Sequence, residues 1–283
     1  MLRIVIKNKI GSFEIGGGSH ETCRLISIDG IGLVGKTATT IKFSGVPGNK
    51  IIDASVNNRV ITMLFDISAG DFYLTKILKV LQEECEILFF LGDKRRKITG
   101  KVLESVELET ITYRQLYKIA VQFYCEMPFF TDFTDRVLSL STRTDNFPTS
   151  IEEGTAYITL PAVATTRSAT VKITNFGDMK TYPKITVISQ EPANSITISN
   201  QTTGNSITLS RTISIDEKIV FDFEERKIKS SISGSVINSI TDASLLDSIY
   251  LDCGINELLV TNDSINLLVS EISYSNLYSA VII

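Results

Sequence analysis

The chain lacks tryptophan and has a single histidine, His20, among its 283 residues. Nucleophilic catalysis by serine or cysteine usually needs a neighbouring base, which is most often histidine. His20 follows three consecutive glycines near the N-terminus, and a histidine on a surface loop is the simplest interpretation there. We therefore expect that the protein is not an enzyme.

Cysteine is also scarce. The chain has four, Cys23, Cys85, Cys125 and Cys253, which are scattered and form no C-x-x-C pair. Their number and spacing exclude metal sites built from histidine and cysteine. No phosphate-binding loop of the form G-x-x-x-x-G-K-[ST] is present either. The sequence thus predicts no cofactor and no metal, and reduced thiols in a protein made in a cytoplasm.

Two further absences limit the partners. No apolar run is long enough to cross a bilayer, which argues against a membrane span. The net charge of -4 argues against nucleic acid as a partner, because phosphate binding needs a basic surface. The N-terminus has no continuous apolar core of the kind that signal peptides carry.

A strand from Leu116 to Cys125 organises the first half of the chain. Apolar residues alternate there with more polar ones, which is typical of a strand with one buried face. Pro128 has no N–H to donate and should close this strand. The pattern around it predicts a barrel-like α+β domain over residues 1–132, in the order strand, strand, arm, strand, helix and three strands.

The helix of this domain is predicted from the spacing of Leu74, Ile77, Leu78, Leu81 and Cys85. Apolar residues at i, i+3, i+4 and i+7 share one helical face. We take that face as buried.

Residues 31–55 are predicted to form an extended arm. This stretch contains five glycines and one proline between short runs that favour strands. Long ordered loops are usually functional, and exposed apolar surface marks a partner site. The candidate assembly residues are Ile31, Leu33, Val34, Ile41, Phe43 and Val46.

The second half contains short β-prone runs separated by turn signals, with no long amphipathic helix. This spacing predicts an antiparallel β-sandwich over residues 155–283. Residues 133–154 are polar and aperiodic, and are predicted to be a linker or domain entry. The predicted fold class is therefore mainly β, in two domains.

Several segments, taken in order, resemble the distal tail proteins of long-tailed (siphovirus-type) bacteriophages and of related tail-like particles. The most characteristic of them is the strand end Cys125-Glu126-Met127-Pro128-Phe129. The others are ISIDGIGL (26–33), VNNRVITMLFDI (56–67), YLTKILKVL (73–81), RRKITGKVLESVEL (95–108), NFGDMKTYPKITV (175–187), IVFDFEERKIKS (219–230) and DCGINELLV (252–260).

This resemblance implies a structural virion protein without a cofactor. Proteins of this kind form a ring, commonly a hexamer, at the distal end of the tail tube. The N-terminal domain makes the ring, and a galectin-like C-terminal sandwich faces outward. The implied partners are further copies of the chain, the major tail tube protein, a tail-associated or tail-tip protein, and a receptor-binding protein. The implied location is the virion tail tip or baseplate, after synthesis in the bacterial host cytoplasm.

A second function is a carbohydrate-binding host adhesin that acts through the C-terminal sandwich. The fold alone does not favour it, because one fold hosts unrelated functions. Tyr182, which precedes Pro183 at a turn, is the best candidate for an exposed aromatic platform. Ring size, host, and phage or bacteriocin origin stay open at this stage.

Overall fold

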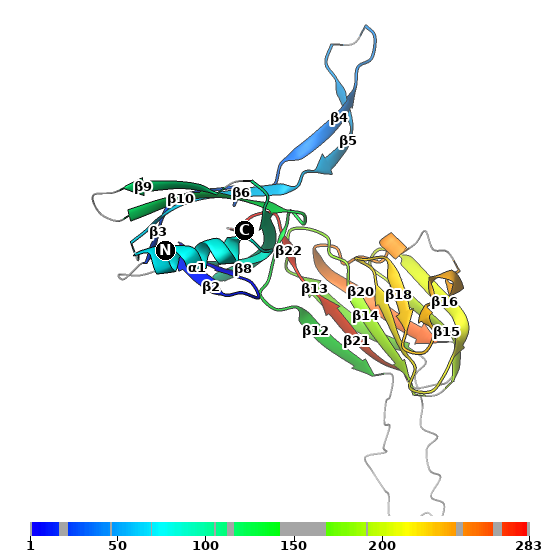
Figure 1. Cartoon of the computed structure of the whole chain (residues 1–283). Coiled ribbons are helices and arrows are strands. Elements are labelled where there is room, and N and C mark those ends of the chain that lie inside the picture. Colours follow the sequence, from blue (N-terminus) through cyan, green and yellow to red (C-terminus); the bar gives the residue numbers. More distant parts are fainter. Residues whose placement is uncertain are drawn as a thin grey trace, which may run out of the picture. The chain divides into compact units, whose positions relative to one another are not determined.

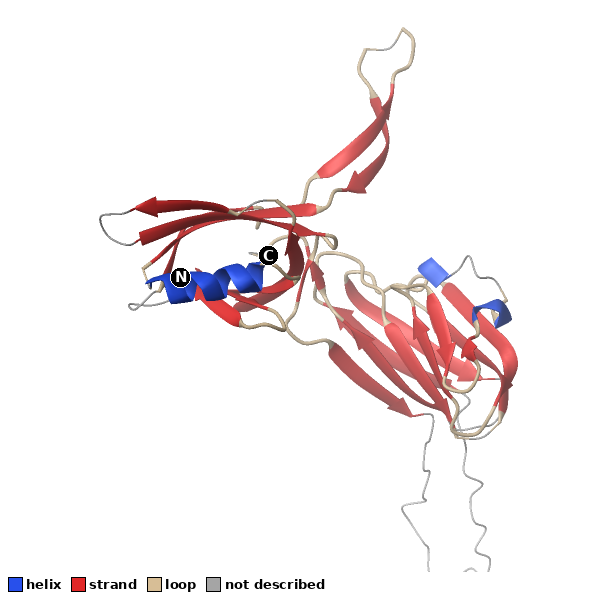
Figure 2. Cartoon of the chain, in the orientation of Figure 1, coloured by secondary structure: helices blue, strands red, loops and turns tan. Residues whose placement is uncertain are grey.

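The computed structural model describes residues 2–16, 22–45, 47–68, 70–104, 106–111, 116–141, 168–190, 192–241, 246–262 and 268–281. Strands dominate these residues (Figure 2), and their pairing is antiparallel throughout. The predicted mainly β fold class is confirmed. His20 and Val46 lie outside the described residues.

Contacts group the chain into two compact units. The first comprises Met1–Phe133 together with Leu277–Ile283, and the second comprises Thr134–Asn276. The predicted bounds differ from this division at two places. Residues Arg136–Ser141, predicted as linker, form a strand that pairs along its length with Leu268–Tyr274. Residues after Asn276, predicted as sandwich, group with the first unit instead.

Among its described residues, the first unit contains one helix, α1 (Gly70–Leu81). Its strands are β1 (Leu2–Lys7), β2 (Ser12–Ile15), β3 (Cys23–Asp29), β4 (Lys36–Ile41), β5 (Lys50–Val56), β6 (Arg59–Ile67), β7 (Cys85–Leu91), β8 (Lys94–Val102), β9 (Glu107–Ile111), β10 (Leu116–Cys125), β11 (Phe130–Thr131) and β22 (Leu277–Tyr278).

The main sheet of this unit runs in the order β2-β1-β7-β8-β10-β6-β3. Its two outer strands approach each other, because the Gly16 N–H donates to the Cys23 carbonyl at 3.0 Å. The sheet is thus bent into a nearly closed barrel. Side chains alternate along β6, where every second residue from Arg59 to Ile67 is buried. This period of two sends one row of side chains into the core.

Helix α1 packs against this core (Figure 1). Ile77 and Leu81 of the predicted face are buried, and so is Val80, which was not predicted. Leu74 and Leu78 are only half-buried, although Leu74 packs against the core. Cys85 is buried but begins β7, because the helix ends at Leu81.

We expect Ile77→Ala to lower the free energy of unfolding by about 2–5 kcal/mol, as large-to-small changes in a packed core do. Leu78→Ala, one position along the same helix, should cost clearly less because its side chain keeps contact with water. Urea denaturation of both variants measures the difference. Equal losses would show that the helix packs through another face.

The second unit is a sandwich of two antiparallel sheets. One has the order β12-β21-β14-β17-β18-β19 and the other β13-β20-β15-β16. The strands are β12 (Arg136–Ser141), β13 (Ser168–Asn175), β14 (Lys184–Ser189), β15 (Ala193–Asn200), β16 (Asn205–Ile213), β17 (Lys218–Asp222), β18 (Lys227–Ser230), β19 (Gly234–Ser235), β20 (Gly254–Asn262) and β21 (Leu268–Tyr274), with the short 3₁₀ helix η1 (Ile237–Ser239).

Both sheets contribute to one core, for example through Ile185 and Phe221 from the first sheet and Ile196 and Leu258 from the second. The predicted antiparallel sandwich is present, while its galectin-like character stays a prediction. Strand β12 was not predicted, because it is short and lies within residues 133–154, which are polar and aperiodic as a whole. It places one apolar side chain, Leu138, against the core, and its neighbours Val137 and Ser139 are exposed.

Candidate assembly surface

The arm contains a β-hairpin, β4–β5, that forms a two-stranded sheet of its own. Its register runs from Lys36 opposite Val56 to Ile41 opposite Lys50, with a bulge near Thr39. Figure 1 shows this hairpin projecting from the barrel of the first unit. All of β4 is exposed, and so is β5 up to its last residue, Val56. A two-stranded hairpin is at best marginally stable in water without packing on something else.

The candidate residues divide into three groups in the structure. Leu33, Ile41 and Phe43 are exposed, with 73, 45 and 52% of their surface accessible. Val34 is half-buried. Ile31 packs against the barrel core and belongs to the root of the arm, so its apolar character serves the fold of its own chain.

Two further apolar residues of the arm, Ile51 and Ile52, were not among the predicted ones and are 61 and 56% exposed. Both lie on β5 beside the bulge. The sequence did indicate that at least one of them is exposed, because two adjacent isoleucines of a strand cannot both face one core. The exposed apolar set of the arm is therefore Leu33, Ile41, Phe43, Ile51 and Ile52.

The arm leaves the barrel through a tightly packed glycine. Gly30 has a φ of +85°, and a Cβ built on it would lie 2.0 Å from the Val60 carbonyl oxygen. Both the left-handed backbone and the close approach of β6 require glycine here. The first root of the arm, at Gly30, is thus packed against β6. This strand follows the second root of the arm, at Asn57.

The buried guanidinium of Arg59 lies at this root. Arg59 is only 3% exposed, and burial lowers its pKa. It donates to the carbonyl oxygens of Pro128 at 2.6 Å, Ser279 at 2.6 Å and Gly32 at 2.8 Å, and also to that of Gly30. Its guanidinium carbon lies 4.5 Å from the centre of the Phe130 ring. The buried charge is thus satisfied by peptide dipoles and an aromatic face.

The second root is fixed by Asn57. Its backbone N–H donates to the Gly35 carbonyl at 3.0 Å, and its side-chain oxygen accepts from the Thr37 hydroxyl at 2.7 Å. Both ends of the arm are therefore bound by named hydrogen bonds, although the hairpin between them is exposed.

We expect Gly30→Ala to destabilise the first unit more than Gly45→Ala. Both glycines have positive φ, and a non-glycine residue there costs about 1–2 kcal/mol. A Cβ at Gly45 would meet open space, while one at Gly30 would overlap the Val60 carbonyl. Thermal denaturation of the two variants gives the comparison, and a lower melting temperature for Gly45→Ala would contradict this account of the root.

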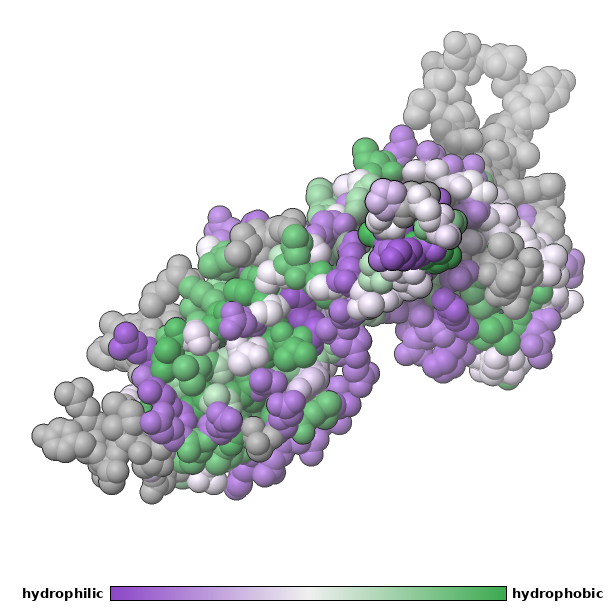
Figure 3. Space-filling view, turned by 90° about the horizontal axis from the view of Figure 1, so that it is seen from above, coloured by the Kyte–Doolittle hydropathy of each residue, from purple (hydrophilic) through white to green (hydrophobic). Residues whose placement is uncertain are grey.

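Apolar surface is not confined to the arm. Seen from above, the surface carries hydrophobic areas between hydrophilic ones (Figure 3). On the outer side of the barrel, Ile26 of β3 and Val60 of β6 are 45 and 39% exposed. On α1, Phe72 is 87% exposed. The first unit therefore has further apolar surface that contacts with other chains could cover.

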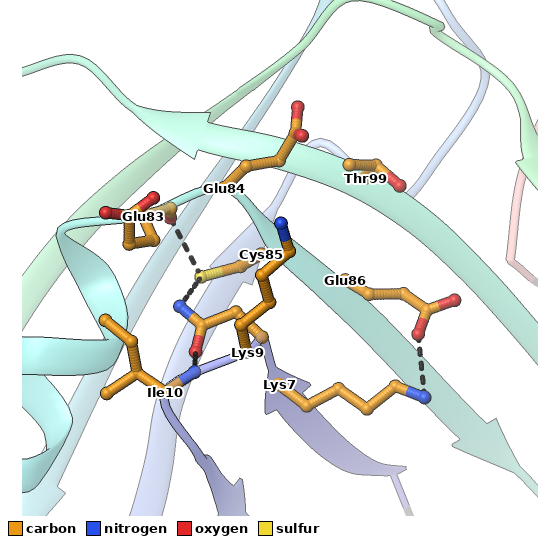
Figure 4. Close-up of a pocket in the computed structure, with 9 residues that line it drawn as sticks. Lys7, Lys9, Ile10, Glu83, Glu84, Cys85, Glu86 and Thr99 are labelled. Carbon is orange, nitrogen blue, oxygen red and sulfur yellow. Dashed lines mark hydrogen bonds and ion pairs between the residues drawn. The ribbon is translucent and has the colours of Figure 1, made fainter.

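A hollow beside the first unit's β1 and β7 carries charges of both signs (Figure 4). Lys7 pairs with Glu86 at 2.8 Å. At its base the Cys85 sulfur lies 3.3 Å from the carbonyl oxygens of Val80 and Glu83, either of which can accept its single S–H. Burial raises the pKa of Cys85 to about 11. The thiol is protonated at neutral pH and is a poor nucleophile.

In the second unit, Tyr182 is half-buried and packs edge-on to Tyr250, with ring centres 6.3 Å apart. The Lys180 ammonium lies 4.8 Å from the Tyr250 ring centre and 5.8 Å from that of Tyr182. Tyr182 is therefore covered in part by its neighbours, and it is a smaller platform than the sequence suggested.

Within the described ranges, no three histidine, cysteine, aspartate or glutamate side chains are placed to share a metal ion. Among the same residues, no helix is long and apolar enough to cross a membrane.

We expect a single thiol to react in the folded protein. Cys253 is exposed, whereas Cys23, Cys85 and Cys125 are buried. Burial raises the pKa of these three to about 12, 11 and 11, which lowers their thiolate fraction. Maleimide labelling followed by mass spectrometry should give one label in buffer and four in denaturant. Rapid modification of a second cysteine in buffer would contradict the packing described here.

Comparisons with known proteins agree with this architecture. Residues 176–278 match the family model for the siphovirus-type tail component, C-terminal domain. A search of curated proteins finds no match. The resemblance to distal tail proteins that the sequence indicated is confirmed by this family match.

Two solved structures share the fold along nearly the whole chain. The crystal structure of phage SPP1 Dit, a hub of the adsorption apparatus in phages that infect Gram-positive bacteria, matches with a TM-score of 0.65 and 12% identity, covering 98% of both chains. A chain of the phage P2 baseplate in its activated conformation with calcium matches with a TM-score of 0.51 and 10% identity, again covering 98% of both chains. At such identity these matches describe the fold.

Proposed function

We propose that this protein, whose C-terminal part matches a siphovirus-type tail component, is a structural component of a phage tail tip that assembles into a ring. The family match and the shared fold support a structural role in a tail or baseplate. The ring, its interface and its neighbours are our proposal.

The observation that carries the proposal is the exposed arm hairpin. A hairpin whose strands pair only with each other leaves its apolar side chains in water. Contiguous exposed apolar side chains mark sites of contact with another chain. Contact with a partner would both cover Ile41, Phe43, Ile51 and Ile52 and order the hairpin.

Charge favours a second copy of the chain as that partner. The hairpin carries Lys36, Lys42 and Lys50 against one acidic residue, Asp53, so its charge is positive. The whole chain carries a net charge of -4, so the rest of each copy is acidic. A cationic arm that reaches an acidic neighbour is electrostatically matched, which guides association and fixes register.

An arm on one face that docks on a different face of the next copy makes a heterologous contact. Such contacts close into a ring when the rotation between copies closes. The resemblance to distal tail proteins points to a hexamer. The same resemblance points to the tail tube protein on one side of the ring and tail-tip proteins on the other.

The test measures the mass of the native full-length protein. We expect a ring with a central hole in negative-stain electron microscopy, and a multiple of the protomer mass by native mass spectrometry. Phe43→Asp and Ile51→Asp should each raise the protein concentration needed for assembly at least tenfold, because a charge would have to be desolvated in the contact. Deletion of Gly32–Asn49 should abolish assembly.

The matched control is Ile232→Asp in the second unit, where the residue it replaces is 65% exposed. This variant should assemble like the parent protein. A protein that stays monomeric at all concentrations, or a ring that survives arm deletion, would contradict the proposal. A folded monomer from the deletion variant, seen by circular dichroism, would show that the loss is in assembly.

The adhesin function stays a second proposal without a specific structural observation in its favour. Tyr182 is only half-exposed, and Lys180 and Tyr250 lie against it. We therefore place the structural role first.

A further inference from the structure

The chain returns to the first unit after it has formed the second. Residues Leu277–Val281, which we call the return segment, lie in the first unit although residues 134–276 separate them from the rest of it. Leu277 and Tyr278 form β22, which pairs with β11. Tyr278 and Val281 are part of the barrel core, and Val281 is fully buried.

The return segment contacts the root of the arm directly. The Val281 N–H donates to the Ile31 carbonyl at 3.1 Å. The Ser279 carbonyl accepts from Arg59, and Arg59 also donates to the carbonyls of Gly30 and Gly32. Three consecutive carbonyls at the first root, those of residues 30, 31 and 32, thus accept hydrogen bonds from Arg59 and Val281.

The return segment is itself well anchored. The Arg96 guanidinium carbon lies 3.5 Å from the centre of the Tyr278 ring, and Arg96 pairs with Asp132 at 3.1 Å. Asp132 also accepts from the Tyr278 hydroxyl at 3.5 Å. These contacts join the segment to β8 and to the chain just after β11, so its position over the arm root is defined.

Arg59 connects the two roots. It is the first residue of β6, three residues after β5 ends at Val56. It reaches back to Gly30 and Gly32, before β4 begins. A single planar guanidinium therefore spans both ends of the arm and the return segment. Several donors fixed in one plane are what this geometry needs, and lysine cannot supply them.

We propose that Arg59 and the return segment form a clamp that positions the arm, so that the arm is presented for assembly only once the chain has returned to the first unit. In a chain whose residues 277–281 are missing or displaced, the Ile31 carbonyl and the Nη2 group of Arg59 would lose these hydrogen-bond partners. Its arm root would be loose, and the apolar hairpin would be poorly placed for a neighbouring copy. The clamp thereby excludes incomplete chains from assembly.

The role in assembly rests on the proposed function, whereas the positioning of the arm does not. Two readouts on the full-length protein separate them. Hydrogen exchange of residues 30–37 and 54–58 reports on the arm root, with the amides of β1 and β7 as an internal reference for the barrel. The concentration needed for assembly reports on ring formation.

Two pairs of variants isolate the clamp. Val281→Pro removes the N–H that reaches Ile31, while Val281→Ala removes more of the buried side chain and keeps the N–H. Arg59→Lys keeps the charge but loses the planar fork, and Arg24→Lys makes the same change at an exposed arginine of β3. We expect Val281→Pro and Arg59→Lys to speed exchange at the arm root at least tenfold relative to β1 and β7, and to raise the assembly concentration at least tenfold. Val281→Ala and Arg24→Lys should change neither the relative exchange at the arm root nor the assembly concentration by more than about twofold.

Exchange that rises equally in the arm root and in β1 and β7 would overturn the proposal, because it would show general destabilisation. Unchanged exchange at the root in both Val281→Pro and Arg59→Lys would overturn it as well. If the root loosens but assembly is unaffected, the clamp positions the arm without controlling assembly, and the assembly role is wrong. A ring that survives arm deletion would reject the proposed function and leave the exchange test of the clamp standing.

Discussion

A guanidinium that is removed from water must find acceptors for its N–H groups, and this requirement shapes the first unit. Isolated buried charge is very costly, and it is tolerated only when it is fully paired and hydrogen-bonded. Arg59 meets the requirement with four backbone carbonyls and the face of Phe130. Those carbonyls come from the arm root, from Pro128 after β10, and from the return segment. The positions of these three pieces of chain are therefore linked through one side chain.

The same requirement explains why the surrounding residues are what they are. Gly30 brings the arm root close enough to β6 for its carbonyl to reach Arg59, and any side chain there would meet the Val60 carbonyl. Pro128 has no N–H of its own, but its carbonyl accepts from Arg59. The strand terminator expected from sequence thus also supplies an acceptor. Phe130 packs on Phe89 with ring centres 5.5 Å apart, which holds its face towards the guanidinium.

Local pattern was sufficient for much of this fold. The alternation in residues 116–125 and 59–67 reflects a barrel with one buried face, and a period of two is visible in any sequence. The helix was predicted from its spacing, yet Val80 was overlooked and Leu78 was overestimated. Spacing gives the general direction of the buried face, but the packing of neighbouring strands decides which edge of that face is covered.

Contacts between distant residues were beyond sequence analysis. Arg59 appeared as an ordinary strand residue, because its acceptors are backbone carbonyls that carry no sequence signal. The return segment was assigned to the sandwich, since nothing in Leu277–Val281 indicates which core it joins. Strand β12 was assigned to a linker because its six residues lie within a stretch that is polar and aperiodic as a whole. The apolar content of the arm was recognised, but Ile31 was not distinguishable from its exposed neighbours.

The predictable and the unpredictable features belong to different parts of the arm: the hairpin itself and the contacts that position it. The exposed hairpin is defined by local sequence, since its two strands form a sheet of their own and its apolar residues are exposed in the part of the chain that the structure describes. Its placement is defined by contacts made across more than 200 residues, namely the bonds from Arg59 to Ser279 and from Val281 to Ile31. A protein that assembles through an arm needs both properties, because an apolar hairpin without a fixed root would expose an apolar surface whose orientation is not defined. Fixing the root through the return segment makes the direction of the arm a property of the whole chain.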